Sequence, residues 1–248
     1  MEITSVNNDL VKESAKLQQK KYRTQSSKFL LEGYKAIKEA FDCGIKLDKI
    51  FVEKNHLKEY DFAKDLIIET TEPVLKKLTT TESAPEAIAI GYQKVYDKNL
   101  LKNTKKVVLL EDIKDLGNLG TIIRSSVAFG ADAIILYGES VDIYNPKCVR
   151  ASVGNLWKLP IIHLTKIEEL EDNFKDFERI ATLPRSNNLL KTFKVKQPCL
   201  VMFGSEANGL SEDLIKFSTT SVKIEMAKTV ESLNLATSVS VILYELFV

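Results

Sequence analysis

Residues 107–130, VVLLEDIKDLGNLGTIIRSSVAFG, decide the fold of the chain. The segment opens on four consecutive apolar residues, which is the pattern of a strand buried on both faces of a sheet. A polar loop follows, and apolar residues then recur at helical spacing until Gly130, which stands where a helix commonly ends. These helical residues are Leu119, Ile122, Ile123 and Val127. The segment therefore predicts one strand–loop–helix unit of a parallel sheet.

The same alternation continues toward the end of the chain. Asn145-Pro146 marks the start of a short helix, because Asn caps helices and Pro suits the first helical position. Strands that alternate with helices predict an α/β fold with a mostly parallel sheet, whose ligands bind beyond the carboxyl ends of the strands. We expect these further strands over residues 133–137, 180–182, 200–203 and 221–224, and a final helix over about 233–247.

The first part of the chain predicts a smaller α/β domain. We expect helices over residues 8–20 and 29–43, and strands over 49–52 and 87–92. A polar, lysine-rich stretch then separates the two parts of the chain. The predicted division is a first domain of residues 1–94, a linker of 95–106 and a second domain of 107–248.

The composition is that of an ordinary globular protein, with 44% hydrophobic and 28% charged residues. No apolar run reaches the roughly 18–20 residues that span a bilayer, and the first residues lack the order of a secretory signal. We therefore expect a cytoplasmic protein. The cysteines and histidines are too scattered for a zinc site, so we expect free thiols and no metal. They are Cys43, Cys148, Cys199, His56 and His163.

The net charge of +1 says little about partners, but the distribution of charge says more. Residues 12–28 carry six cationic side chains against a single acidic one, Glu13. Such a stretch suits a phosphate backbone, and a solvated helix face is the alternative. The candidate phosphate contacts are Lys12, Lys16, Lys20, Lys21 and Arg23.

Three loops that follow predicted strands carry polar residues suited to a small ligand, and the first two also carry glycines that let the backbone approach it. The first lacks the G-x-G-x-x-G fingerprint of dinucleotide binding, which disfavours a dehydrogenase. The loops are residues 111–120, which lead to Arg124, residues 203–210, and residues 224–234.

Each polar residue in these loops also has an ordinary structural interpretation. Asn118 at a helix start can act as a cap, and so can Ser232 or Asn234 before the final helix. Arg124 can form a surface ion pair, or its guanidinium can hold a phosphate through two hydrogen bonds. Taken singly, none of these residues identifies a function.

Taken in order, the loops resemble the three motifs of the SpoU (TrmH) family of RNA ribose 2′-O-methyltransferases. Residues 145–154, NPKCVRASVG, are similar to the segment between the first two motifs, and the start of the chain, including FLLEG at 29–33, looks like the small substrate-binding domain of many members. The chain departs from the family pattern at Leu116, Glu225 and Lys228. The matching residues are Asn118-Leu119-Gly120-x-x-x-Arg124, Gly204-Ser205-Glu206-x-x-Gly209-Leu210, Ile224-x-Met226, Ser232-Leu233-Asn234-x-Ala236 and Leu243-Tyr244-Glu245.

The resemblance implies a SPOUT-like fold, in which the C-terminal part of a parallel-sheet catalytic domain forms a trefoil knot, beside a small N-terminal α/β domain. It implies S-adenosylmethionine (AdoMet) as the cofactor and a homodimer packed through the catalytic domains. The implied cofactor-binding residues are Thr182, Phe203, Gly204, Gly209, Ile224, Met226 and Leu233. The implied catalytic residues are Arg124, Asn118, Glu206, Ser232 and Asn234.

The implied partner is RNA, and no membrane is involved. Ribosomal RNA is the expected substrate, because the N-terminal domain is similar to that of members that act on it. Transfer RNA is the alternative substrate, and a non-catalytic RNA-binding protein on the same fold is the alternative function.

Overall fold

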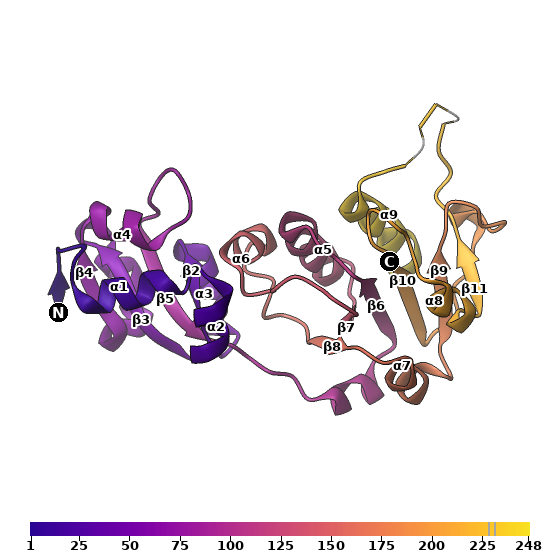
Figure 1. Cartoon of the computed structure of the whole chain (residues 1–248), viewed down its shortest axis with the longest axis horizontal. Helices are drawn as coiled ribbons and strands as arrows, with labels where there is room; N and C mark the ends of the chain where they lie inside the picture. The colour runs from indigo at the N-terminus through magenta and orange to yellow at the C-terminus, as the bar shows by residue number, and fades with distance from the viewer. Residues whose placement is uncertain (228, 231) are drawn as a thin grey trace. The chain divides into compact units, whose positions relative to one another are not determined.

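The computed structural model describes residues 1–227, 229–230 and 232–248, so Lys228 lies outside the described residues. The chain forms two compact units. The first contains Met1–Val95 and Asp142–Trp157, and the second contains Tyr96–Val141 and Lys158–Val248 (Figure 1). Residues 142–157, which the sequence placed with the second domain, therefore pack with the first unit.

The first unit is built on a mixed sheet in the order β1-β4-β3-β5-β2. Its neighbours β1 and β4, and β3 and β4, are parallel, whereas β5 is antiparallel to β3 and to β2. The strands are β1 (Glu2–Ile3), β2 (Lys28–Glu32), β3 (Leu47–Glu53), β4 (Ile67–Thr70) and β5 (Ala87–Tyr92).

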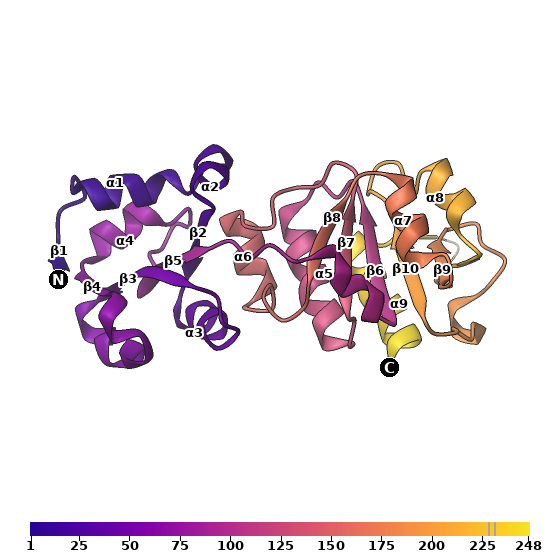
Figure 2. The same ribbon diagram turned by 90° about the horizontal axis from the view of Figure 1, so that it is seen from below.

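Helices cover both faces of this sheet. Figure 2 shows α1 and α4 on one side of the strands and α3 on the other. The side chains under α1 and α4 form one apolar cluster that includes Val11, Leu30, Val74 and Ile90. The helices are α1 (Asp9–Lys16), α2 (Lys20–Ser26), α3 (Tyr34–Asp42), α4 (Glu72–Leu78), α6 (Pro146–Ser152) and the 3-10 helix η1 (Lys54–Leu66).

Two predicted helices of the first unit differ from the structure. The predicted helix over 29–43 begins as strand β2, because Phe29, Leu30 and Leu31 are all fully buried and pair with β5. Gly33, at a φ of 83°, turns the chain from that strand into α3. The predicted helix over 8–20 ends at Lys16, and α2 begins at Lys20.

Arg23 was expected to contact phosphate, and this prediction is wrong. Its side chain is 1% exposed, and its guanidinium Nη2 lies 2.7 Å from Oδ2 of Asp142. Its Nη1 also donates to the main-chain oxygens of Leu17 and Gln18, at 2.9 Å each. Arg23 therefore joins α2 to the 142–157 segment inside the first unit and is not available to RNA.

Replacing Arg23 by Ala is expected to lower the free energy of unfolding by about 3 kcal/mol. The reason is that the Asp142 carboxylate, which is 16% exposed, is left without its cation. Lys38→Ala is the matched control, since it removes an exposed ion pair with Asp42 and should leave stability nearly unchanged. Urea unfolding of the full chain measures both values. Equal losses in the two variants would contradict a structural role for Arg23.

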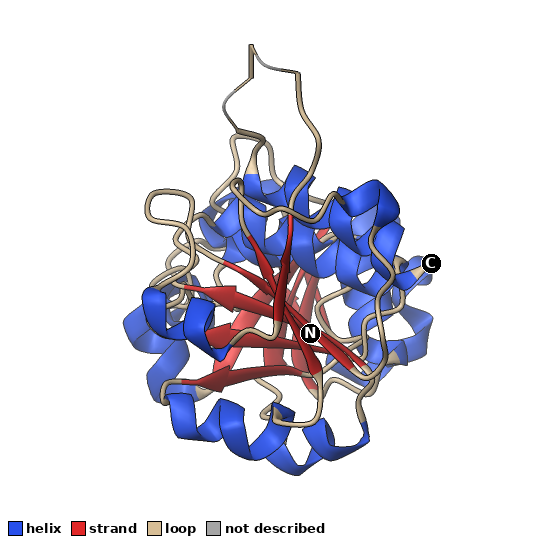
Figure 3. Ribbon diagram, turned by 90° about the vertical axis from the view of Figure 1, so that its right-hand side faces the viewer, coloured by secondary structure: helices blue, strands red, loops and turns tan. Residues whose placement is uncertain are grey.

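The second unit contains a six-stranded, wholly parallel sheet in the order β11-β9-β10-β6-β7-β8. The predicted α/β fold with a parallel sheet is confirmed, although β8 was not predicted. Figure 3 shows helices on both sides of the strands. The strands are β6 (Lys106–Glu111), β7 (Ala133–Tyr137), β8 (Ile161–Leu164), β9 (Glu178–Thr182), β10 (Cys199–Phe203) and β11 (Thr220–Val222).

The helices of the second unit form two layers. One layer packs through Leu170, Phe174 and Leu214 on strand residues such as Leu109 and Met202. In the other layer α5 and α9 lie against each other, and their Ser125 and Ser240 hydroxyls are 2.7 Å apart. The helices are α5 (Leu116–Ala128), α7 (Ile167–Phe174), α8 (Glu212–Phe217), α9 (Leu235–Phe247) and the 3-10 helices η2 (Lys98–Asn103) and η3 (Leu190–Thr192).

The three cysteines are free, as expected. Burial raises the pKa of the Cys148 and Cys199 thiols to about 12, so both stay protonated at neutral pH. Within the described ranges, none of the helices combines the length and the apolar character needed to cross a membrane.

Candidate active site

A pocket of about 540 Å³ lies beyond the carboxyl ends of β9, β10 and β11 in the second unit. Its place is the one expected for a ligand of a parallel sheet. All seven residues predicted to bind the cofactor line it: Thr182, Phe203, Gly204, Gly209, Ile224, Met226 and Leu233. The structure therefore brings together residues from three separate loops at one cavity.

The pocket also has walls that the sequence did not indicate. Leu183 and Pro184 follow Thr182 directly, and their position at the end of a strand was the one available signal. Ser238 and Ile242 come from α9 and line the pocket from the side of that helix. The sequence indicated Ile242 only as part of the apolar face of the final helix, and it did not single out Ser238.

The loop after β10 approaches the pocket with its backbone closely packed. Ser205 and Gly209 exchange main-chain hydrogen bonds of 3.2 and 3.0 Å across the loop, and Gly209 has a φ of 68°. A Cβ atom added to Gly204 would lie 1.9 Å from the carbonyl carbon of Gly209 and 2.1 Å from the nitrogen of Leu210. The observed loop therefore has no space for any side chain at position 204.

Two side-chain hydrogen bonds beside this pocket join the start of α5 to the loop after β10 and to the residue that precedes α9. The Asn118 amide Nδ2 donates to Oε1 of Glu206 at 2.8 Å, and the Asn234 amide Nδ2 donates to Oδ1 of Asn118 at 3.0 Å. Glu206 and Asn234 line the pocket, whereas Asn118 sits between them on α5. We name Asn118, Glu206 and Asn234 the polar triad.

The capping interpretation holds for one member of the triad. Asp115, not Asn118, is the cap of α5, and its carboxylate accepts the main-chain N–H of Asn118 at 2.7 Å. The side chain of Asn118 is thereby left to bridge Glu206 and Asn234. Asn234 does cap α9, because its Oδ1 accepts from the main-chain N–H groups of Ala236 and Thr237.

The other two predicted catalytic residues lie differently. Ser232 lines the pocket. Arg124 is exposed on α5, six residues and so about 9 Å of helix beyond Asn118, and it is not among the pocket-lining residues. Among the described residues Arg124 has no ion-pair partner, so its guanidinium is available to a bound anion. The structure thus brings four of the five residues to the pocket and its rim and places Arg124 outside it.

The described residues of the site supply polar and carboxylate oxygens. Among the described residues, no three His, Cys, Asp or Glu side chains gather as metal ligands would. A cavity of this size, with apolar walls and few convergent polar groups, is typical of a site for a small organic molecule. An exposed arginine on the neighbouring helix suits a larger anionic partner that stays outside the cavity.

Comparison with known proteins gives a consistent result over the whole chain. Residues 105–244 match the model of the SpoU rRNA Methylase family, and residues 8–89 match that of the MRM3-like substrate binding domain. The chain is 32% identical to an uncharacterized tRNA/rRNA methyltransferase of Synechocystis, over 98% of this chain and 92% of that protein.

Two further relatives bear on the reaction. The chain is 28% identical to a 23S rRNA (uridine(2479)-2′-O)-methyltransferase of Streptomyces viridochromogenes, over 98% of this chain and 90% of the relative. An AdoMet-bound rRNA methyltransferase of Sinorhizobium meliloti has a similar structure, with a TM-score of 0.89 and 28% identity. That similarity covers 99% of this chain and 96% of the other.

Proposed function

The chain belongs to the SpoU rRNA methylase family, and we propose that it transfers the methyl group of AdoMet to a ribose 2′-hydroxyl of ribosomal RNA. The predicted membership of this family of AdoMet-dependent RNA methyltransferases is thereby confirmed. The single observation that carries the proposal for this chain is the pocket itself, with the predicted cofactor residues on its walls and the polar triad at its rim.

The pocket fits the cofactor by size and by chemistry. Its volume of about 540 Å³ falls within the roughly 300–1,000 Å³ of small-molecule sites. Phe203, Ile224 and Leu233 offer apolar surface to an adenine, and the close-packed loop at Gly204 offers main-chain groups to its edge. When bound, AdoMet supplies a methyl group on a positively charged sulfur, which is a good leaving group.

The polar triad and Ser232 would position the acceptor. Asn118 on α5 is hydrogen-bonded to both Glu206 and Asn234. A shift of any one of these three residues would therefore disturb the other two. Positioning of this kind accounts for much of the acceleration in a bimolecular transfer, since reacting atoms must approach in line. We assign the triad to this orienting role.

We assign Arg124 to the RNA and not to the cofactor. Its exposure and its lack of a described ion pair suit a phosphate next to the target ribose. A guanidinium is a poor base, but its charge stabilises a developing alkoxide. This assignment agrees with its position outside the cavity.

Three further features belong to the same proposal. A trefoil knot in the C-terminal part is supported by β10, which lies between β6 and β9 although it follows both in the chain. A homodimer through the catalytic domains is supported by the exposed apolar residues Val241, Tyr244 and Val248. The first unit would bind the RNA, in line with its match to a substrate-binding domain. A cytoplasmic location remains a prediction from the sequence.

The test uses the purified full chain, tritiated AdoMet and unmodified transcripts of 23S rRNA, 16S rRNA and tRNA. We expect label in a ribosomal RNA only, on a nucleotide whose 3′ bond resists alkaline hydrolysis. Label in tRNA would show that the substrate is transfer RNA and not ribosomal RNA. Label on a base would contradict ribose methylation. Calorimetric AdoMet binding without any transfer would favour the non-catalytic alternative.

A further inference from the structure

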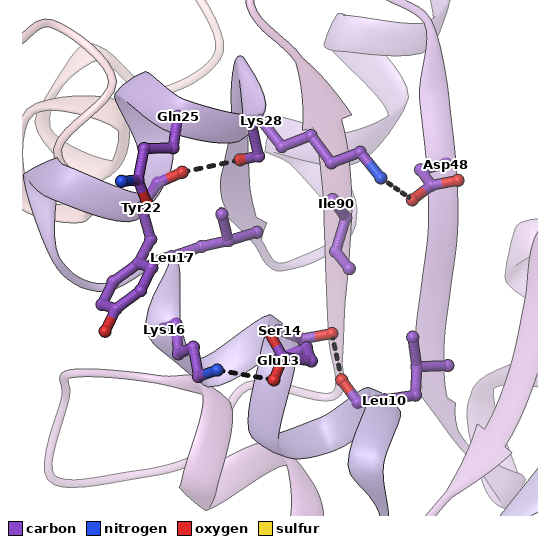
Figure 4. A pocket seen from close by; sticks show the side chains of 11 residues that line it. Leu10, Glu13, Ser14, Lys16, Leu17, Tyr22, Gln25, Lys28, Asp48 and Ile90 are labelled. Carbon is purple, nitrogen blue, oxygen red and sulfur yellow. Dashed lines mark hydrogen bonds and ion pairs between the residues drawn. The ribbon is translucent and has the colours of Figure 1, made fainter.

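A second pocket, of about 320 Å³, lies in the first unit between α1, α2 and the neighbouring strands (Figure 4). Its floor is apolar and includes the buried residues Leu17 and Ile90. Its sides carry two ion pairs, with Lys16 Nζ at 2.5 Å from Glu13 and Lys28 Nζ at 2.7 Å from Asp48. The cavity therefore presents hydrogen-bond donors and acceptors around an apolar base.

One aromatic ring, that of Tyr22, lines this pocket, and a second, that of Tyr92, lies beside the pocket-lining Lys28. Each ring is flanked by two lysines. The Nζ atoms of Lys16 and Lys21 lie 5.6 and 5.7 Å from the centre of the Tyr22 ring. The Nζ atoms of Lys28 and Lys46 lie 5.0 and 4.8 Å from the centre of the Tyr92 ring. Tyr22 lines the cavity, and Tyr92 pairs with Lys28 across β2 and β5.

Several groups in and around the pocket have unused binding capacity. The Tyr22 hydroxyl and the Gln25 amide, both at the cavity, make no hydrogen bond to another described side chain or main-chain group. Neither Lys21 nor Lys46 is paired with a carboxylate of the described residues. A ligand can therefore gain polar contacts here without first breaking an internal one.

These groups identify the kind of ligand. A free phosphate would enter beside the carboxylates of Glu13 and Asp48, which would repel it. A nucleobase carries both donors and acceptors on its edge and has a flat face for stacking. Recognition of unpaired RNA combines such stacking on aromatic side chains with cations that follow the backbone.

We propose that this pocket binds one unpaired nucleobase of the RNA substrate, stacked on Tyr22, while Lys21 and Lys46 contact the adjoining phosphates. The inference rests on the proposed function in one respect, namely that RNA is the substrate. It adds that recognition by the first unit requires a base outside a double helix. It also places that recognition on the α1 and α2 side of the sheet.

The first experiment measures binding by fluorescence anisotropy with the full chain. The probes are a labelled single-stranded decaribonucleotide of mixed sequence and the blunt duplex that it forms with its complement. Tyr22→Ala is expected to weaken binding of the single strand about tenfold. Tyr22→Phe keeps the ring and loses only the hydroxyl, so it should weaken single-strand binding much less than Tyr22→Ala. Duplex binding should be unchanged in both variants.

Phe41→Ala is the matched control, because Phe41 is 39% exposed on α3, on the opposite side of the sheet. It should leave single-strand binding unchanged. The proposal is overturned if Tyr22→Ala binds the single strand like wild type, or if duplex binding falls to the same extent. Thermal melting of each variant verifies that the fold is intact, which is expected because Tyr22 is only half-buried.

A second measurement separates this inference from the proposed function. With the 23S rRNA transcript as substrate, Tyr22→Ala should raise KM for RNA about tenfold and leave kcat and AdoMet affinity unchanged. An unchanged KM overturns the base pocket while methyl transfer stands. If wild type transfers no methyl group, the proposed function fails, and the anisotropy result still decides whether the pocket binds an unpaired base.

Discussion

Arg124→Ala is expected to reduce methyl transfer to RNA about a thousandfold, while the affinity for AdoMet stays within about twofold of wild type. The reason is geometric. Arg124 is exposed on α5 and does not line the cofactor pocket, so its removal leaves the pocket unchanged. It does remove the charge that we assign to the developing alkoxide, and the loss of one such group typically lowers kcat by 10²–10³-fold.

Single-turnover transfer from tritiated AdoMet measures this effect, and calorimetry measures cofactor binding. Thr121→Ala is the matched control, because Thr121 is exposed one turn earlier on the same helix, and it should keep full activity. Arg124→Lys keeps the charge but loses the planar fork, so it should recover only part of the rate. Activity of Arg124→Ala within a few-fold of wild type would show that the assigned role is wrong.

Gly204→Ala is expected to lower AdoMet affinity at least a hundredfold. The added methyl group would lie 1.9 Å from the Gly209 carbonyl carbon and 2.1 Å from the Leu210 nitrogen. Both are main-chain atoms that cannot rotate away, so the loop after β10 must open. Opening removes one wall of the pocket and draws Glu206 away from Asn118, because both residues depend on that loop.

Gly130→Ala is the control that distinguishes a specific loss of AdoMet affinity from a general loss of stability. Gly130 has a φ of 75°, and a Cβ atom added to it would have no neighbour within 4 Å, so alanine there should lower stability by about 1–2 kcal/mol through backbone strain alone. It should bind AdoMet with unchanged affinity. Isothermal titration of both variants below their melting temperatures provides the comparison. Equal losses of affinity would trace the effect of Gly204→Ala to destabilisation of the unit as a whole.

Local signals were sufficient for much of the second unit. The strand and helix within 107–130, the cap and proline of α6, and the final helix were all predicted with small differences at their ends. Strand β8 was missed because it is four residues long and carries the exposed polar His163. Strand β2 was read as helix because its apolar run merges with that of α3, and only pairing with β5 distinguishes the two.

Local signals also indicated many of the residues of the candidate site. Glycine-rich and polar loops after strands pointed to the residues that line the pocket, since parallel strands place their carboxyl ends together. The sequence did not predict which polar side chains form hydrogen bonds with one another. The bridge from Asn118 to Glu206 and Asn234 depends on Asp115 taking the cap of α5, a choice between two side chains three residues apart. Contacts between distant segments, such as Arg23 with Asp142, leave no trace in local spacing.

Because residues 142–157 pack with the first unit, the chain cannot be divided into two domains at a single point. A gene truncated after codon 95 would encode that unit without Asp142, the counter-charge of Arg23. It would also strip Phe29 of the neighbouring rings of Tyr144 and Trp157, 4.8 and 5.3 Å away. A chimera that takes residues 1–95 from a homologue is therefore expected to fold only when it takes residues 142–157 from the same homologue. Two separate stretches of the gene must then be inherited together.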